Sequence, residues 1–226
     1  MDSNKKPSWS FVDVFLGFAI YYLVLTLGDV LLTKFNITGN TFFVLISLVG
    51  ALVLVGILTL FLNSNRNQDK MSWDSKELSH NLFIGIVIGG IIGLISAISV
   101  LVNGISIFSF FSLEGLEANY GPGNFMDHVF FLIAFVLLIP ISEELFFRGW
   151  MFSALKNKFH WVFAAFITAL FSSIFLIGNI NFFFLIVMGI IFAVAYEKTG
   201  SILTSVVSHM VCNLIITIMI WIKGGS

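Results

Sequence analysis

Seven long apolar runs restrict this chain to folds in which most helix surfaces face lipid or other helices. A membrane-spanning helix needs about 20 mostly apolar residues. The candidate spans cover residues 10–32, 41–62, 82–103, 128–147, 161–179, 182–197 and 201–222. We therefore expect an all-α fold, a polytopic transmembrane helix bundle with about seven or eight membrane helices.

Composition supports the same class of protein. Hydrophobic residues make up 58% of the chain and charged residues 10%, whereas soluble domains carry about 25% charged residues. The net charge of −1 gives no reason to expect a nucleic-acid partner. The single cysteine, Cys212, excludes an intrachain disulfide. The first apolar run is too long for a signal sequence and is expected to remain as a span.

The spans are expected to form one continuous membrane domain. Its N-terminal helices occupy residues 1–125 and its core residues 126–222. The helix that contains 128–147 is expected to continue to about Asn157, with a short eighth helix there as the alternative. Within span 82–103, small residues at four-residue spacing predict close helix packing. They are Gly85, Gly89 and Gly93.

Basic residues indicate the orientation, because short cytoplasmic loops are enriched in Lys and Arg. With a cytoplasmic N-terminus and seven crossings, most of them fall on the cytoplasmic side. These are Lys5, Lys6, Arg66, Lys70, Lys76, Lys156, Lys158 and Lys198. Only Lys34 and Lys223 fall on the opposite side. The sequence thus predicts an integral membrane protein with its N-terminus in the cytoplasm.

Three ionisable residues interrupt the apolar stretch from Phe130 to Met151. They are Glu143, Glu144 and Arg148, in the segment PISEELFFRGW. A charged group at bilayer depth costs a few kcal/mol or more, so such groups usually face a partner or a wet cavity. This trio is either a structural ion pair or a reaction centre.

Antiparallel helices bring other polar residues to the same depth. Glu143 lies 15 residues before the polar turn at Lys158, and Asn179 lies 21 residues after it. At about 1.5 Å per residue, the two lie within one or two turns of each other in depth. His209 and Asn213 are four apart on one face of the last span. One pocket is expected to gather these four residues with Glu144 and Arg148.

Charge then suggests roles. Glu144 and Arg148 have the favourable i,i+4 order of a helical ion pair, which leaves Glu143 as the less compensated carboxylate and the candidate general base. His209 and Asn213 could donate hydrogen bonds to an oxyanion. Together these roles predict amide hydrolysis. The alternative is structural: the ion pair, His209 and Asn213 would then only hold helices together.

The segment from Pro140 to Leu214 resembles the CPBP family of membrane proteins, which includes the CAAX prenyl endopeptidases and the bacterial Abi-type proteins. The EExxxR motif is present as Glu143, Glu144 and Arg148, and HxxxN as His209 and Asn213. The run YEKTGSI precedes the latter motif. The family's FxxxH motif is matched from Phe175 to Asn179, with asparagine where the family has histidine.

The resemblance implies an intramembrane peptidase in which this histidine helps the first glutamate hold and activate water. Asn179 can hydrogen-bond a water but cannot take up a proton. The resemblance also leaves a divalent metal open as a cofactor, with Glu143 and His209 as the only candidate ligands. Since the chain has no HExxH motif and no second histidine here, we expect no tightly bound zinc.

Two functions remain open. The first is a glutamate-dependent endopeptidase in a bacterial plasma membrane, acting on a membrane-associated peptide or protein. The second is a pseudoprotease that regulates a membrane protein such as a sensor kinase, acts as a scaffold, or confers bacteriocin immunity. Both place membrane lipids around the chain. A transporter is disfavoured, because no inverted repeat is seen.

Overall fold

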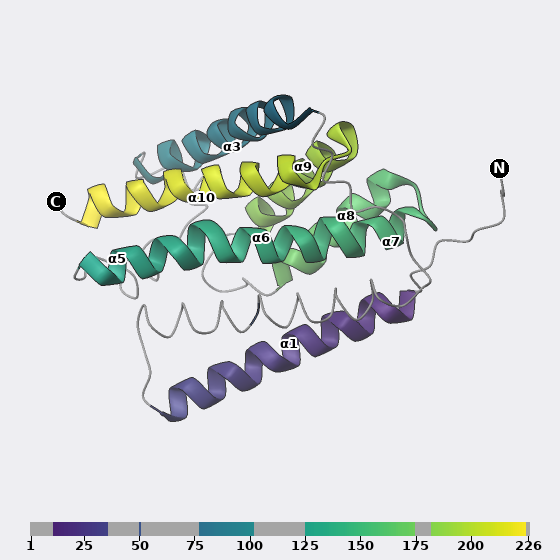
Figure 1. Cartoon of the computed structure of the whole chain (residues 1–226), viewed down its shortest axis with the longest axis horizontal. Coiled ribbons are helices and arrows are strands. Elements are labelled where there is room, and N and C mark those ends of the chain that lie inside the picture. The colour runs from purple at the N-terminus through teal and green to yellow at the C-terminus, as the bar shows by residue number, and fades with distance from the viewer. Residues whose placement is uncertain (1–10, 36–49, 51–76, 102–124, 175–181, 225–226) are drawn as a thin grey trace.

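The computed structural model describes residues 11–35, 50, 77–101, 125–174 and 182–224. This part of the chain contains no strand, which confirms the all-α fold class. The helices in Figure 1 are α1 (Phe11–Lys34), α3 (Leu78–Leu101), α5 (Phe125–Phe131), α6 (Ile139–Glu144), α7 (Ser153–Lys156), α8 (Trp161–Ile174), α9 (Phe182–Thr199) and α10 (Ile202–Gly224). Two wider π-helical segments, η2 (Leu132–Leu138) and η3 (Leu145–Phe152), join α5, α6 and α7.

Four of the described helices are long and apolar enough to cross a membrane. They are Leu78–Ile98, His128–Lys156, Phe182–Thr199 and Ile202–Met219. Two shorter apolar helices, Phe15–Gly28 and Trp161–Ile174, match two further predicted spans. The predicted span 41–62 lies outside the described residues except for Gly50. These four helices indicate an integral membrane protein.

The segments from α5 to α7 form one unbroken helix. Each junction residue in η2, α6 and η3 has right-handed helical dihedrals, so the axis passes through without a turn. The predicted extension of this helix is confirmed as far as Lys156. No separate eighth helix occurs between Glu144 and Lys156, because those residues are its last three turns or so.

Helix α3 packs along α10, as Figure 1 shows. The three glycines predicted to pack closely line this contact. A Cβ at Gly89 would lie 2.3 Å from the Ser208 carbonyl oxygen, and one at Gly85 would lie 2.9 Å from Val207. Because real Cβ atoms do not come that close, the glycines allow the two backbones to approach.

Helices α8 and α9 pack against each other beside the long helix. The chain leaves α9 at Gly200, which has φ of 65° and donates its N–H to the Tyr196 carbonyl at 2.8 Å. Glycine is favoured there because this left-handed conformation strains residues with a Cβ. The turn starts α10 and so determines the depth of the polar residues along it.

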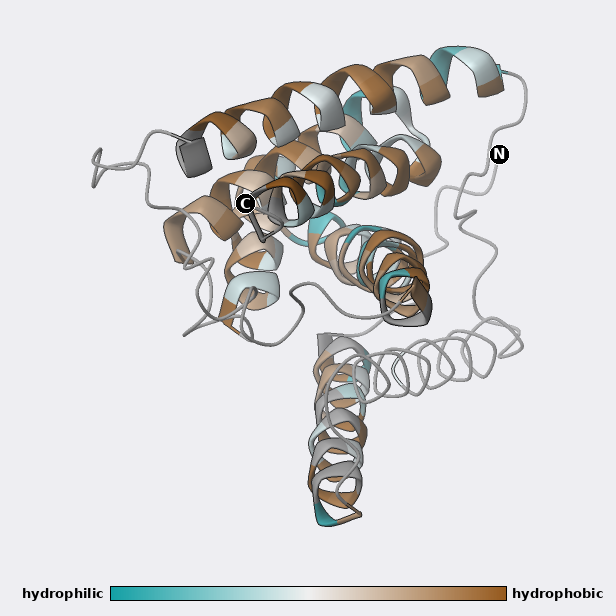
Figure 2. Ribbon diagram, turned by 90° about the vertical axis from the view of Figure 1, so that its left-hand side faces the viewer, coloured by the Kyte–Doolittle hydropathy of each residue, from teal (hydrophilic) through white to brown (hydrophobic). Residues whose placement is uncertain are grey.

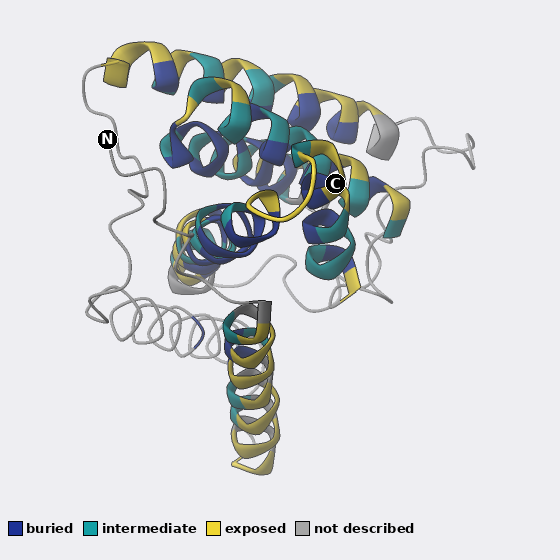
Figure 3. Cartoon of the chain, turned by 90° about the vertical axis from the view of Figure 1, so that its right-hand side faces the viewer, coloured by how far each residue is buried: buried dark blue, intermediate teal, exposed yellow. Residues whose placement is uncertain are grey.

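The outer surfaces of the bundle are apolar, whereas the polar groups are enclosed. Figure 2 shows hydrophobic residues along the outward sides of α3 and α10, and Figure 3 shows that the outer side of α3 is exposed. The exposed residues there include Phe83, Ile91 and Leu94. A lipid environment suits this inverted distribution. The polar side chains inside it define the candidate site.

Candidate active site

The long helix changes its geometry on both sides of the two glutamates. Segment η2 ends immediately before α6, which contains Pro140, Glu143 and Glu144, and η3 follows directly. Proline lacks a backbone N–H and its ring clashes with the carbonyl four residues before it. A π-turn widens the helix and accommodates both defects, and such turns are frequent at functional sites. The local sequence therefore produces an irregular helix where the charges lie.

Glu144 lies at the centre of the polar network. Its side chain is fully buried, and its Oε1 accepts a hydrogen bond from Arg148 NH1 at 3.0 Å. The same oxygen lies 3.0 Å from His209 Nδ1. The predicted i,i+4 ion pair is confirmed, and the structure adds His209 as a second partner from α10. A buried carboxylate is stabilised by such charge-assisted bonds.

Arg148 joins this network to helix α9. Its NH2 group donates to the Gly189 carbonyl at 3.0 Å, and its guanidinium carbon lies 5.6 Å from the centre of the Phe192 ring. The His209 ring stacks on Phe192, with centroids 5.0 Å apart and planes 26° from parallel. Phe192 therefore contacts both of the side chains that bond to Glu144. Neither Gly189 nor Phe192 was among the predicted site residues.

Two buried polar atoms of this network have no partner among the described residues. They are Glu144 Oε2 and Arg148 Nε. Buried polar groups are nearly always hydrogen-bonded, to protein or to water. Each of these two atoms could therefore take one further polar partner.

Glu143 has a different environment from its neighbour. It is partly exposed, and it forms no hydrogen bond or ion pair with the residues that the structure describes. It lies close enough to His209 and Arg148 to feel their charge. The two adjacent glutamates thus differ: Glu144 is bonded to two side chains, whereas Glu143 is partly exposed and bonded to no described residue.

Asn213 makes a contact that the sequence did not predict. Its Nδ2 donates to the Phe135 carbonyl of η2 at 2.8 Å. Two backbone donors could otherwise reach this carbonyl, but the Ile139 N–H bonds to Ala134 and Pro140 has none. Asn213 therefore donates to a carbonyl that receives no backbone hydrogen bond from Ile139 or Pro140. One of its two amide protons is consumed in this contact.

The remaining predicted residue, Asn179, lies outside the described residues, as does Phe175. The other five residues predicted to share one pocket are all described by the structure, and they differ in how closely they associate. Glu144, Arg148 and His209 are directly bonded, Glu143 lies beside them, and Asn213 lies one turn further along α10 from His209.

A divalent metal at this site would need several ligating side chains close together. Among the described residues, no three His, Cys, Asp or Glu side chains are placed to hold one ion. His209 Nδ1 is already engaged with Glu144, so only Nε2 of that ring is available. The candidate ligands Glu143 and His209 alone do not make the three-ligand set of a catalytic zinc site. The described residues do not fit a resident metal.

Helix α1 also reaches this region. The Tyr21 ring is buried and stacks on Phe146, with centroids 5.5 Å apart, and its hydroxyl lies within reach of the Ser142 side chain. A Cβ at Gly17 would lie 1.9 Å from the Trp150 ring, so α1 packs tightly on η3 there. The spacing of Gly17 and Tyr21, four residues apart, was the available signal for this packing face.

The fold and this network define an integral membrane protein with a charged centre enclosed by its helices. Residues 125–215 match the family described as type II CAAX prenyl endopeptidase Rce1-like. This segment, which carries all the site residues discussed above except those of α1, is thus similar to a family of CAAX-protease-type intramembrane peptidases. No curated protein and no solved structure matches the chain.

Proposed function

We propose that this chain is a glutamate-dependent intramembrane endopeptidase that hydrolyses a peptide bond in a membrane-associated peptide or protein. The observation that carries the proposal is the unequal environment of the two glutamates. Glu144 is fully buried and bonded to Arg148 and His209, whereas Glu143 is partly exposed. A general base needs access to a water molecule, and the exposed part of the Glu143 carboxyl supports this role for Glu143 over Glu144.

In this mechanism Glu143 takes a proton from a water molecule whose oxygen attacks the scissile carbonyl. The carbonyl oxygen becomes an oxyanion, and the proton passes from Glu143 to the leaving amine as the C–N bond breaks. Glu144 positions His209 by accepting a hydrogen bond from Nδ1. In the neutral ring Nε2 then accepts a hydrogen bond from the water, and in the imidazolium it donates one to the oxyanion. Arg148 keeps Glu144 in place. No step is routed through a metal.

The proposed substrate is a leader peptide, a bacteriocin-like precursor or a signalling peptide in a bacterial plasma membrane. The N-terminus would face the cytoplasm, which follows from the bias of Lys and Arg in the loops. Nothing among the described residues selects for a prenyl chain, so prenylated tails are one substrate class to be tested alongside unmodified ones.

A second candidate function has its own support in Asn179, which stands where the family has histidine. In this case the chain is a pseudoprotease that regulates a partner such as a sensor kinase, acts as a scaffold, or confers bacteriocin immunity. The network of Glu144, Arg148 and His209 would then serve the fold, since it ties α6, η3 and α10 together.

Peptide cleavage distinguishes the two functions. The full-length protein in detergent is offered a membrane-anchored leader peptide and a farnesylated CAAX peptide, beside Glu143→Gln and Asn179→His. Cleavage by the parent that is lost in Glu143→Gln supports the peptidase. Cleavage that occurs only in Asn179→His supports the pseudoprotease. Complementation of a deletion strain by Glu143→Gln would show that catalysis is not the cellular role.

A further inference from the structure

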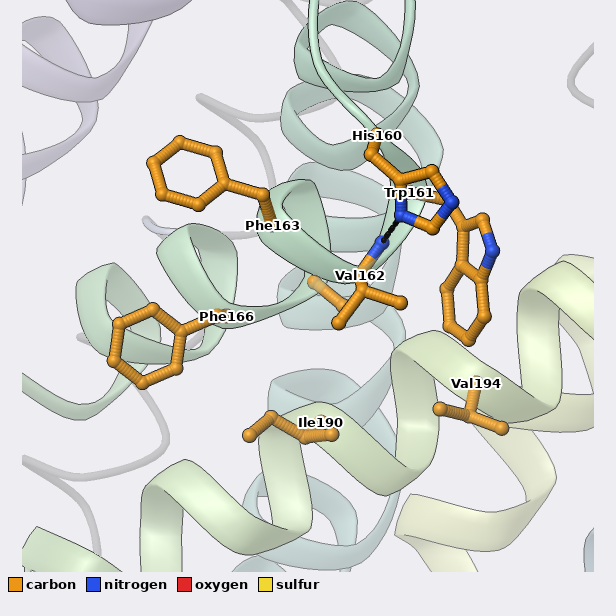
Figure 4. Close-up of a pocket in the computed structure, with 8 residues that line it drawn as sticks. His160, Trp161, Val162, Phe163, Phe166, Ile190 and Val194 are labelled. Carbon is orange, nitrogen blue, oxygen red and sulfur yellow. Dashed lines mark hydrogen bonds between the residues drawn. The ribbon is translucent and has the colours of Figure 1, made fainter.

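Two apolar grooves lie side by side on the outer face of α9, away from the site. The first, of about 500 Å³, lies between α8 and α9, and Figure 4 shows Trp161, Phe163 and Phe166 of α8 with Ile190 and Val194 of α9 around it. The second, of about 400 Å³, lies between α3 and α9. Both fall within the range of ligand-binding pockets.

A single ridge of α9 separates the grooves. Ile190 and Val194 line both of them, and Lys198 continues the same i,i+4 row. Lys198 lines the second groove, and its ammonium lies 5.7 Å from the centre of the Trp161 ring, which lines the first. The Lys198 ammonium therefore lies near the C-terminal end of α9, between the two grooves.

The second groove extends over most of one lipid leaflet. Its lining spans about 12 Å along α9, from Ile190 to Lys198, and about 12 Å along α3, from His80 to Ile88. The first groove is shorter, about 7.5 Å along α8 from Trp161 to Phe166. Half of a bilayer's hydrocarbon core is about 15 Å. A ligand with two parallel apolar chains and a polar group at their junction fits two grooves that flank a ridge ending in a cation.

Polar groups at the mouth complement a particular head group. Glu77 and Lys198 line the same groove, and neither forms an ion pair with a described residue. The groove thus carries one anion and one cation. His80 lines the second groove at this level. On the first, His160 Nδ1 accepts the Val162 N–H at 3.4 Å (Figure 4), which leaves Nε2 as a donor.

We propose that this face of α9 binds a two-chain phospholipid with a primary amine, such as phosphatidylethanolamine. One acyl chain lies in each groove, the phosphate contacts Lys198, and the ammonium contacts Glu77. A phosphate alone would use only the cation, and an anionic lipid would meet the Glu77 carboxylate unfavourably. The bound lipid would cover the outer side of the helix whose Gly189 carbonyl holds Arg148.

The test is native mass spectrometry of the delipidated full-length protein, titrated with palmitoyl-oleoyl phosphatidylethanolamine, phosphatidylcholine or phosphatidylglycerol. One ethanolamine lipid should bind about tenfold more tightly than either of the others. Lys198→Gln should weaken its binding about tenfold. Glu77→Gln should abolish the preference for ethanolamine over choline. Lys34→Gln, the same charge change at the end of α1, should have no effect.

The two grooves are tested with lysophosphatidylethanolamine, which has one chain and should bind about tenfold more weakly than the two-chain lipid. Equal binding of the three two-chain lipids, tighter binding of the glycerol lipid, or no response to Lys198→Gln would each overturn the proposal. Binding is measured without any peptide, so the result is independent of whether the chain is a peptidase.

Discussion

The contact between Gly189 and Ala169 offers a sharp test of how the site is held. A Cβ added at Gly189 would lie 2.8 Å from the Ala169 Cβ and 3.0 Å from its Cα. Because Ala169 is fully buried and its backbone belongs to α8, it cannot rotate away. Gly189→Ala must therefore push α8 and α9 apart. The Gly189 carbonyl would move with α9, away from Arg148 NH2.

Two contributions determine the size of the effect. Overpacking of a close helix contact costs about 1–3 kcal/mol, and a weakened hydrogen bond to a charged group costs about 1.5–3 kcal/mol. We expect Gly189→Ala to lower the free energy of unfolding by about 2.5–6 kcal/mol, the sum of the two. The measurement is reversible unfolding in mixed micelles with increasing SDS, followed by circular dichroism.

The matched control is a double variant in which the methyl group is on α9 at position 189 and no longer on α8 at position 169. In Gly189→Ala with Ala169→Gly, the added Cβ occupies the space that the Ala169 Cβ leaves, so most of the lost stability should return. Ala169→Gly alone should cost about 1 kcal/mol through helix propensity. Equal stability of Gly189→Ala and the parent, or a double variant no better than the single one, would refute the proposed contact.

Three further predictions follow from the same network and from α1, all measured by the same unfolding assay. Arg148→Met should destabilise by about 3–5 kcal/mol, because it leaves the buried Glu144 charge without its partner, and adding Glu144→Gln should restore part of this. Asn213→Ala should lower the free energy of unfolding by about 1–3 kcal/mol, since the Phe135 carbonyl loses this donor. The loss should be much smaller in a Pro140→Ala background, where a backbone N–H becomes available. Equal losses in both backgrounds would contradict the assignment. Gly17→Ala should cost about 1–3 kcal/mol by displacing α1 from Trp150, and an unchanged midpoint would show that α1 does not pack there.

The bundle and the ion pair were predictable because both depend on spacing within one helix. Long apolar runs require spanning helices, and the four-residue interval between Glu144 and Arg148 places them on one face. The glycines of α3 were predictable for the same reason. His209 was expected near the glutamates from the depth of its helix, and its bond to Glu144 fits that expectation.

The contacts of Asn213 and Gly189 were not predictable from spacing. Arithmetic at 3.6 residues per turn assumes regular helices, whereas η2 and η3 shift the direction of each following side chain. The partner of Asn213 also depends on which carbonyl lost its donor, which requires knowing that Ile139 bonds to Ala134. Gly189 contributes through its backbone, and a carbonyl has no signature in the sequence.

The bond from Asn213 to Phe135 carries a consequence for the divergence of related chains. Pro140 and Asn213 lie 73 positions apart. Pro140 has no N–H to donate to the Phe135 carbonyl, and the Asn213 amide donates to it instead. A lineage that replaced the proline by any residue with an N–H would relax selection on this amide proton. A lineage that kept the proline could lose the asparagine only by gaining another donor nearby. Among relatives, asparagine should therefore be lost more often where the proline has been replaced than where it is kept.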